Sequence, residues 1–521
     1  MLNACMHRVV LPYEQAGGAS RFENYTMQLV NLDNPLLRRI GEIACASGID
    51  AWVVGGYVRD MLMNRPTKDI DIAASGDGIA LAHTVRDVLH GSRVVEFERF
   101  GTAKLLVDDV EIEFVGTRRE AYEQHSRKPV VTTGSIDDDL RRRDFTVNAM
   151  AASLMEKDFG CLLDPFGGRH DLERQLLRTP LDAASTFSDD PLRMMRAFRF
   201  AAQLAFELAP DASHAIADMS ERIGIVSMER VRDEFFKLLA TPIPSIGLAP
   251  MQEHGLLQFV FPELDALAGV DQRSIEYPDG VKNFHHKDVF YHTLKVLDNL
   301  CTESDNIWLR FSALLHDIAK PRTKAFVEGT GWTFHGHPEI GARMTKHIFR
   351  RMKLPHDPLP FVQKMVLLHL RPIALNNEEV TDAAIRRLIV DAGEDLEQLI
   401  ILCRADITSK NPKLVRRYLR NYDVLVERIR TVEERDRLRE WQPPLDGTTI
   451  MRVCGIGPGI AVGVLKTKIE DAVLDGVIPN TQEAAMQYLL QIKDDILASE
   501  RLEKPKSRRS QLNGLPDKLK E

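Results

Sequence analysis

Along the first third of the chain, hydrophobic positions form short strand-like runs, and beyond it they repeat with helical spacing. Three such runs, AWVVGG (51–56), DIDIAA (69–74) and AKLLVDDVEIEFVG (103–116), are separated by short helical patterns, which is typical of an α/β domain. After about residue 172, nearly every segment has its apolar residues at helical spacing. The pattern therefore predicts an α/β head followed by a long all-α region.

Stretches that contain proline and glycine mark the predicted boundaries inside the all-α region. They are LATPIPSIGLAP (239–250), IEYPDGVKNFHH (275–286) and REWQPPLDGTT (439–449). The expected organisation is an N-terminal tail (1–26), the head (27–172), a helical neck (173–245), a His-rich helical domain (246–440), a C-terminal helical region (441–500) and a disordered tail (501–521). Because Met27 opens the first convincing helical pattern, residues 1–26 are a candidate non-native extension.

Composition narrows the class of protein. The chain has 521 residues, 44% of them hydrophobic and 28% charged, with a formal net charge of −8. This balance excludes a uniformly basic nucleic-acid wrapper, so that a polyanion must be held by a local basic surface. The six cysteines include no C-x-x-C pair, and no apolar run reaches the roughly 18 residues of a membrane span. We therefore expect a cytoplasmic protein with no membrane partner and no disulfide framework.

Two aspartates interrupt the apolar strand DIDIAA. Asp69 and Asp71 are two residues apart, and side chains at i and i+2 of a strand point to the same face, with Cα atoms about 6.6 Å apart at ~3.3 Å per residue. Two carboxylates at this spacing repel each other unless a cation lies between them. Mg²⁺ is the natural cation, because it prefers carboxylate and phosphate oxygens. The alternative is a pair of solvated acids on an edge strand.

The surroundings of the pair favour a nucleotide site. Gly55 and Gly56 follow an apolar strand and precede a helical pattern that contains Arg59, an arrangement suited to phosphate binding. Downstream, either Glu111 or Glu113 is placed to supply a third carboxylate from a second strand. Three carboxylates, two metal ions ~3.5–4 Å apart and a triphosphate make up the two-metal scheme of nucleotidyl transfer.

A series of motifs in the chain resembles a known family. The motifs are, in order, GGYVRD (55–60), KDIDI (68–72), RRRDFTVNAMA (141–151), DPFGGRHDLERQLLRT (164–179), DDPLRMMRAFRFAAQLAFE (189–207) and SMERVRDEFFKLL (227–239). Together they resemble the bacterial tRNA nucleotidyltransferase and poly(A) polymerase family, which contains the CCA-adding enzymes. The likeness covers residues 28–245 and, more weakly, the C-terminal part. It implies a polymerase-β-like head.

The resemblance implies roles for individual head residues. Asp69 and Asp71 match the magnesium ligands. Gly55, Gly56, Arg59 and Arg143 match nucleotide-binding positions. The family's third strand has a glutamate after an isoleucine and an arginine a few residues on; Glu113 and Arg118 match them, so the resemblance favours Glu113 over Glu111. Asp144 and Asn148 are expected on one helical face, either as supporting structural residues or in contact with the ligand.

A row of charged residues in the neck suits nucleobase selection. Cytosine and adenine both present an amine donor beside a ring-nitrogen acceptor, which a fixed carboxylate and guanidinium complement, whereas guanine and uracil present the opposite pattern. Leaving buried polar groups unpaired costs about 1–3 kcal/mol each. The predicted selecting pair is Asp190 and Arg193, with Arg196 and Arg199 facing the triphosphate and with Glu229, Arg230 and Glu234 orienting the pair from a neighbouring helix.

The His-rich domain contains a second candidate site. Adjacent His316 and Asp317, with His292 before them and Asp406 after them, resemble the ligand set of HD phosphohydrolases, and His337 with His369 completes a two-metal version. Ligands without thiolates suit Mn, Fe, Ni or Mg more than a structural zinc. The alternative is a domain in which these residues serve packing or RNA contact.

These expectations combine into one functional prediction. The chain adds C and A, without a template, to the 3′ end of tRNA from CTP and ATP with Mg²⁺. The alternatives within the class are a poly(A) polymerase and an enzyme that adds only A or only CC. An alternative from another class is a metal-dependent phosphohydrolase whose head binds RNA; intact carboxylates in the head favour the transferase.

Overall fold

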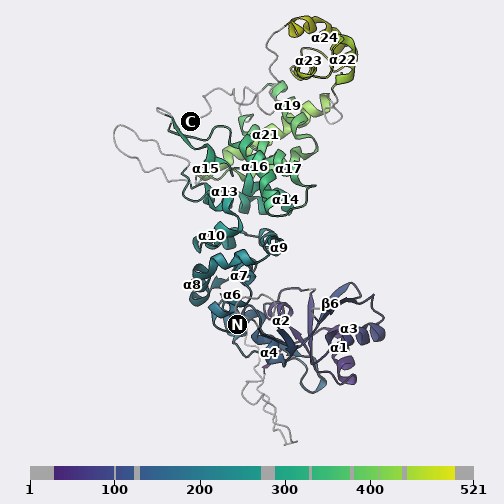
Figure 1. Cartoon of the computed structure of the whole chain (residues 1–521), viewed down its shortest axis with the longest axis vertical. Helices are drawn as coiled ribbons and strands as arrows, with labels where there is room; N and C mark the ends of the chain where they lie inside the picture. Colours follow the sequence, from purple (N-terminus) through teal and green to yellow (C-terminus); the bar gives the residue numbers. More distant parts are fainter. Residues whose placement is uncertain are drawn as a thin grey trace, which may run out of the picture. The chain divides into compact units, whose positions relative to one another are not determined.

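The computed structural model describes residues 28–67, 69–98, 101–121, 130–271, 288–327, 331–375, 381–409, 411–436 and 443–498. The predicted tails at 1–26 and 501–521 lie outside these ranges, as do Met27 and the predicted boundary at 275–286. The chain divides into two compact units between Asp182 and Ala183 (Figure 1). The finer division into neck, His-rich domain and C-terminal region stays a prediction.

The first unit is built on a mixed sheet of eight strands in the order β1-β10-β9-β2-β3-β6-β5-β4. The strands are β1 (Gln28–Leu29), β2 (Ala51–Val54), β3 (Ile70–Ala74), β4 (Val95–Phe97), β5 (Thr102–Val107), β6 (Val110–Gly116), β9 (Ala151–Ser153) and β10 (Cys161–Leu163). The pairing of β3 with β6 is parallel, and the other neighbours pair antiparallel. β7 (Arg118–Ala121) and β8 (Val130–Thr133) form a separate hairpin.

The two faces of this sheet are packed differently. Ile70 and Ile72 of β3 belong to the main core, which they share with buried residues of α1 (Pro35–Ala46) and α3 (Gly78–Leu89). Ala73 points to the other face and packs in a smaller cluster with α4 (Ile136–Arg141). Strand alternation therefore places the odd-numbered positions of β3, Asp71 among them, on the less covered face. The remaining α-helices among the described residues of this unit are α2 (Gly56–Leu62) and α5 (Gly168–Glu173).

The second unit is helical. Its first helices are α6 (Ala183–Asp189), α7 (Leu192–Leu204), α8 (Pro210–Met219), α9 (Met228–Leu239), α10 (Ser245–Glu253), α11 (Leu257–Val260) and α12 (Pro262–Asp265). They are followed by α13 (Val289–Cys301), α14 (Ile307–Leu315), α15 (Lys320–Thr323), α16 (His337–Arg351), α17 (Leu359–Leu368), α18 (Arg371–Ala374), α19 (Asp382–Ala392), α20 (Leu396–Ala405) and α21 (Pro412–Asp436). A hairpin of β13 (Ala325–Val327) and β14 (Gly331–Thr333) interrupts this series.

Three further helices, α22 (Gly447–Cys454), α23 (Ile460–Leu474) and α24 (Gln482–Leu497), share a small core of their own. Within the described ranges, no helix combines the length and the hydropathy that a membrane crossing requires. The predicted fold class, an α/β head followed by an all-α region, is confirmed by these elements.

Candidate active site and metal centre

Three acidic side chains come together at the centre of the sheet. The parallel register of β3 and β6 pairs Asp71 directly with Glu113. Asp69 immediately precedes β3, and its carboxylate adds to burial in raising the pKa of Asp71. Asp71 points to the face opposite α1 and α3. The structure thus brings together the three carboxylates that the sequence predicted, although within the described residues they do not gather as closely as the histidine groups described below.

The electrostatics of this face favour a bound cation. Burial raises the pKa of Asp71, and the neighbouring carboxylates of Asp69 and Asp139 add to the effect against the opposing charges of Arg143 and Lys104. Burial and the Asp71 carboxylate likewise raise the pKa of Glu113. The charge of Asp71 therefore disfavours the charged form of Glu113. Carboxylate oxygens in this arrangement fit Mg²⁺, which would relieve the repulsion.

Gly55 allows an arginine to approach the carboxylates. Its backbone is left-handed, with φ of 71°, and a Cβ built at this position would lie 2.6 Å from Nη1 of Arg143. Only glycine tolerates both conditions without strain. Arg143 is fixed by a hydrogen bond from its Nη2 to Oδ2 of Asp139, 3.1 Å away. Gly55 and Arg143 are thus brought together next to Asp71, while Gly56 begins α2.

Arg59 lies in a buried chain of hydrogen bonds. It donates to both carboxylate oxygens of Asp60 and, at 2.8 Å, to Oδ1 of Asn148. Asn148 in turn donates to Oδ1 of Asp144 at 3.0 Å. The expectation of a common helical face for Asp144 and Asn148 is wrong, because Asp144 precedes a single 3₁₀ turn (Thr146–Asn148). The side chains of Asp144 and Asn148 nevertheless meet, because Asp144 lies just before this 3₁₀ turn.

Two charged residues near the carboxylates were not predicted from the sequence. Asp139 is fully buried and bonds to both Arg142 and Arg143. Burial raises its pKa, but the two arginines outweigh burial and lower it. Lys104 faces Glu113 across β5 and β6, at 3.7 Å, and bonds to Glu111. The spacing of Asp139 before two arginines and the alternation along β5 are sequence signals that could have identified them.

The predicted nucleobase-selecting residues lie on α7 and α9 and at the turn before α7. Asp190 accepts a hydrogen bond of 2.8 Å from Nη2 of Arg230 on α9. Arg193 donates to the backbone oxygen of Thr186 at 3.1 Å. Arg230 therefore lies where it was expected, beside Asp190.

The remaining charged residues of the two helices form a different set of contacts. Glu234 is buried and binds Arg199 at 2.7 Å, with Arg196 3.8 Å away. Burial raises the pKa of Glu234, but the arginines outweigh it and lower that pKa. Glu229 pairs with Lys353, at 2.6 Å. Glu234 thus contacts the two arginines expected at the triphosphate, and Glu229 contacts a residue outside the predicted set.

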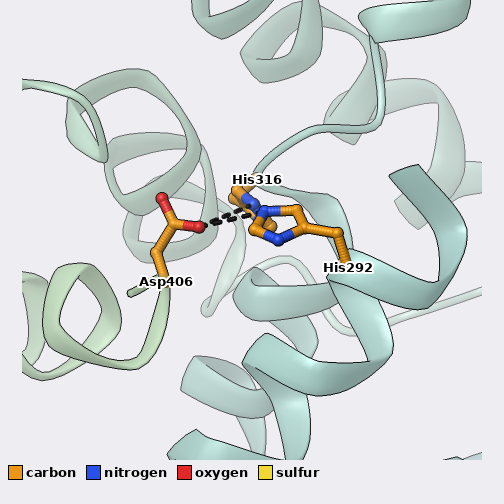
Figure 2. Close-up of side chains that lie close together, drawn as sticks. All are labelled: His292, His316 and Asp406. Carbon is orange, nitrogen blue, oxygen red and sulfur yellow. Dashed lines mark ion pairs between the residues drawn. The ribbon is translucent and has the colours of Figure 1, made fainter. Parts of the chain in front are cut away.

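In the second unit, the six predicted HD residues gather in two groups whose candidate ligand atoms lie within 4.8 Å of one another. One group is His292, His316 and Asp406, and the other is Asp317, His337 and His369. Figure 2 shows the first group, in which Oδ1 of Asp406 lies 3.0 Å from Nε2 of His292 and 3.8 Å from Nε2 of His316. The groups adjoin, because Oδ2 of Asp317 lies 3.1 Å from Nε2 of His316.

The imidazoles are oriented in the way that metal ligands are. Three of them donate from Nδ1 to a backbone carbonyl at 2.7–2.8 Å: His316 to Ala313, His337 to Phe334 and His369 to Val366. Nδ1 of His292 lies 2.9 Å from Oγ1 of Thr408. Such contacts leave Nε2 with its lone pair directed at the centre.

One atom in this centre tests whether a metal fits. Nε2 of His316 is buried and makes no hydrogen bond with any described residue. In the neutral ring with its proton on Nδ1, Nε2 and the Asp317 carboxylate 3.1 Å away face each other as two electron-pair donors, so that the pair requires either a further proton or a cation. A divalent cation between them would satisfy both, and imidazole with carboxylate suits Mn, Fe, Ni or Mg. The residues present therefore fit a metal centre.

The pKa shifts of His316 and Asp317 also show that the carboxylates of the centre favour a nearby positive charge. Burial lowers the pKa of His316, but the Asp317 and Asp406 carboxylates outweigh burial and raise it to about 9. Burial, together with the charges of its histidine neighbours, lowers the pKa of His369 to about 3. The Lys320 ammonium, which was not predicted, bonds to Asp317 at 2.7 Å. Despite burial, His316 and Lys320 hold the pKa of Asp317 well below its usual range.

Three family models match the chain. The "Poly A polymerase head domain" covers residues 51–178, the "Probable RNA and SrmB- binding site of polymerase A" covers 205–267, and the "HD domain" covers 289–411. The first contains the carboxylate site, and the last contains all six HD residues. The matched regions therefore coincide with the two sites built above.

Known proteins extend the match to most of the chain. The sequence is 32% identical over 443 residues to an A-adding tRNA nucleotidyltransferase of Deinococcus radiodurans, across 83% of this chain and 94% of that protein. It is 32% identical over 372 residues to a multifunctional CCA protein of Methylococcus capsulatus, across 68% and 81% of the two chains.

A solved structure of a CCA-adding enzyme in its apo form II matches with a TM-score of 0.58 at 21% identity. The match covers 88% of this chain and 96% of that one, which shows a shared fold. The predicted polymerase-β-like head with a following HD region is thereby confirmed. With one relative aligned over most of both chains and the head model matched across the carboxylate site, the chain belongs to the tRNA nucleotidyltransferase and poly(A) polymerase family and carries an HD domain.

Proposed function

We propose that the protein adds C and A, without a template, to the 3′ end of tRNA, using CTP and ATP. The observation that carries the proposal is the direct pairing of Asp71 with Glu113 in the parallel register, with the Asp69 carboxylate as a charged neighbour of Asp71. Carboxylates placed in this way are the protein's part of two-metal nucleotidyl transfer. Relatives that act on tRNA support the choice of acceptor.

In this mechanism, the chain's residues hold and orient the reactants. Asp69, Asp71 and Glu113 would hold Mg²⁺. Bound Mg²⁺ supplies acidity to the attacking 3′ hydroxyl and charge for the departing pyrophosphate. Arg143 is held by Asp139 beside Asp71 and, in this proposal, contacts the triphosphate. A guanidinium fixed before binding loses little entropy when it meets a phosphate.

Base choice rests on Asp190 and Arg193. The carboxylate accepts from the exocyclic amine of cytosine or adenine, and the guanidinium donates to the ring nitrogen. Arg230 fixes the carboxylate through its 2.8 Å hydrogen bond, so the acceptor is oriented before the nucleotide arrives. Guanine and uracil would place a carbonyl against the carboxylate and an N–H against the guanidinium.

The product is tested with three tRNA substrates that end before CCA, after C and after CC. Each is incubated with CTP, ATP, GTP and UTP, singly and together, and the ends are sequenced. CCA on the first substrate, with no further extension, is the expected result. Addition of A to the third substrate alone would indicate the activity named for the Deinococcus relative, and long A tails on generic RNA would indicate a poly(A) polymerase.

A second function is proposed for the HD centre, on the evidence of the two donor groups and the unsatisfied Nε2 of His316. It is a metal-dependent phosphoesterase that acts on a 2′,3′-cyclic phosphate, a 2′-nucleotide or a blocked RNA 3′ end. Removing a terminal phosphate restores the 3′ hydroxyl that nucleotidyl transfer needs. Open coordination positions for water and substrate would make such hydrolysis chemically accessible.

Metal content and hydrolysis test this second function together. The wild-type protein and the double variant His316→Ala/Asp317→Ala are measured for bound Mn, Ni, Fe and Mg. Their phosphoesterase activity is measured on the 2′,3′-cyclic phosphate, the 2′-nucleotide and the blocked RNA 3′ end. Loss of both metal and activity in the double variant is expected. His347→Ala, which removes an exposed histidine of α16 outside both groups, is the control. A wild type without metal and without activity would reduce the centre to a structural role.

A further inference from the structure

The first turns of α21 carry an exposed basic surface. Four residues, Lys413, Arg416, Arg417 and Arg420, are all exposed. They are spaced as i, i+3, i+4 and i+7, so they lie on one face of the helix. We call this surface the α21 basic face. At 1.5 Å per residue it is about 10 Å long, which is enough to follow two or three successive phosphates of a nucleic-acid strand.

The charges of this face are not neutralised by the protein. None of the four residues forms an ion pair with an acid in the described part of the chain; Arg416 donates to the backbone oxygen of Pro412, and Arg417 lies 5.3 Å from the ring of Tyr418. The second half of the same helix differs. There, Arg428 and Arg435 pair with Asp382, and Arg430 pairs with Glu427. In a chain of net charge −8, four uncompensated cations on two turns call for an anionic partner.

In the sequence, the α21 basic face closely follows the last of the HD residues, Asp406. α21 begins six residues after Asp406, a member of the first donor group, and four residues after Thr408, which contacts His292. Farther along, buried Tyr422, Leu425 and Ile429 fix the helix in the domain. The basic turns therefore belong to a helix that is anchored near the first donor group, because burial and then the neighbouring Cys403 and Asp406 raise the pKa of Tyr422.

We infer that the α21 basic face binds the phosphate backbone of RNA and directs the end of that strand to the HD centre. The substrate of the centre is then an RNA end rather than a free nucleotide. Arginine guanidinium groups and an adjacent aromatic ring are suited to an RNA strand. The binding part stands alone, and the substrate part rests on the phosphoesterase proposed above.

Binding is tested with the full-length protein and tRNA. Arg416→Ala/Arg417→Ala/Arg420→Ala should weaken tRNA binding about tenfold near 0.1 M salt and lower the slope of log Kd against log salt by about two to three. The lysine triple variant, Arg416→Lys/Arg417→Lys/Arg420→Lys, should keep most of the affinity because it keeps the charge. Equal affinity and slope in the alanine triple and the wild type would overturn the inference.

A matched control separates this face from general surface charge. Arg430→Ala removes one arginine from the same helix, but this arginine is already paired with Glu427. It should change tRNA affinity much less than Arg416→Ala does. Equal losses for the two single variants would show a nonspecific effect of charge and contradict a dedicated face.

The substrate part is tested with two phosphodiesters, bis-p-nitrophenyl phosphate and an RNA oligonucleotide that ends in a 2′,3′-cyclic phosphate. The ratio of KM for the RNA to KM for the small compound should rise about tenfold in the alanine triple. An unchanged ratio would overturn delivery of RNA to the centre. A wild type that hydrolyses neither compound would overturn the phosphoesterase and the substrate part, while the tRNA measurement would still decide the binding part.

Discussion

Asp71, a proposed metal ligand, has a charged form that folding disfavours. Its pKa is raised by burial and by neighbouring acids, so its charged form is disfavoured in the folded head. A group whose pKa is raised on folding adds stability at low pH and loses that contribution as the pH rises through the folded value. At neutral pH, the carboxylate is therefore held in place against an electrostatic cost.

Asp71→Asn is expected to lower nucleotide addition by roughly a thousandfold, because it removes a metal ligand. Its thermal unfolding temperature at pH 7 without added metal should equal or exceed that of the wild type, because the repulsion is gone. Incorporation assays at saturating Mg²⁺ and thermal melts check the two parts. Normal incorporation in this variant would exclude the two-metal assignment.

Glu113 and Glu111 provide a matched pair on one strand. Glu113 lies opposite Asp71, whereas Glu111 is exposed and bonds to Lys104. Glu113→Gln should lower the rate of addition by roughly a hundredfold or more, and Glu111→Gln by less than about threefold. Single-turnover rates on tRNA that lacks its terminal A distinguish them. A larger loss for Glu111→Gln would move the third ligand to that residue.

Asp139 should behave in the opposite way to Asp71. It is buried between two arginines, and its pKa is lowered. Its contribution to stability is therefore present above the unfolded pKa of about 4 and is lost as the pH falls through the lower folded value. Asp139→Asn should destabilise the head by about 3 kcal/mol at pH 7, and urea unfolding at pH 7 and pH 3 should show a smaller difference at the lower pH. An equal difference at both values would contradict this account.

At the level of helices and strands, periodicity predicted the parts of the site but not their contacts. The alternation in DIDIAA predicted Asp69 and Asp71 on one face; β3 begins at Ile70, so Asp71 lies in the strand and Asp69 immediately before it. The pairing of β3 with β6 depends on a crossover through α3, which no local pattern specifies. Likewise, the spacing of the charged residues before and along α7 did not determine their partners. Asp190 contacts Arg230, while Glu229 contacts Lys353, because of the way α9 packs.

The contact between Arg230 and Asp190 predicts an effect on base choice. In Arg230→Ala the carboxylate loses its fixed orientation, so discrimination against GTP and UTP should fall about tenfold, consistent with one hydrogen bond of about 1 kcal/mol or slightly more. Misincorporation relative to CTP and ATP is the measurement. Arg232→Ala, on the same helix but paired with exposed Asp233, is the control and should keep the wild-type ratio.

For the chain as a whole, the two sites fall in different compact units, with the carboxylates before Asp182 and the HD centre after Ala183. Their activities should therefore be lost separately. Asp71→Asn should keep at least about half of the wild-type phosphoesterase rate, and His316→Ala/Asp317→Ala at least about half of the wild-type rate of nucleotide addition. Both rates measured on both variants check this, and loss of both activities in either variant would show that the sites depend on each other.

The parallel pairing of β3 and β6 also has a consequence for folding during synthesis on the ribosome. Asp71 and Glu113 are about forty residues apart in the sequence, and closing a loop of that length costs entropy before the strand contacts repay it. The ribosome completes β3 well before β6, and the strand that covers the far side of β2, β9, emerges later still. In the growing chain the two acids are therefore separate, and the proposed catalytic pair first forms when β6 has paired with β3.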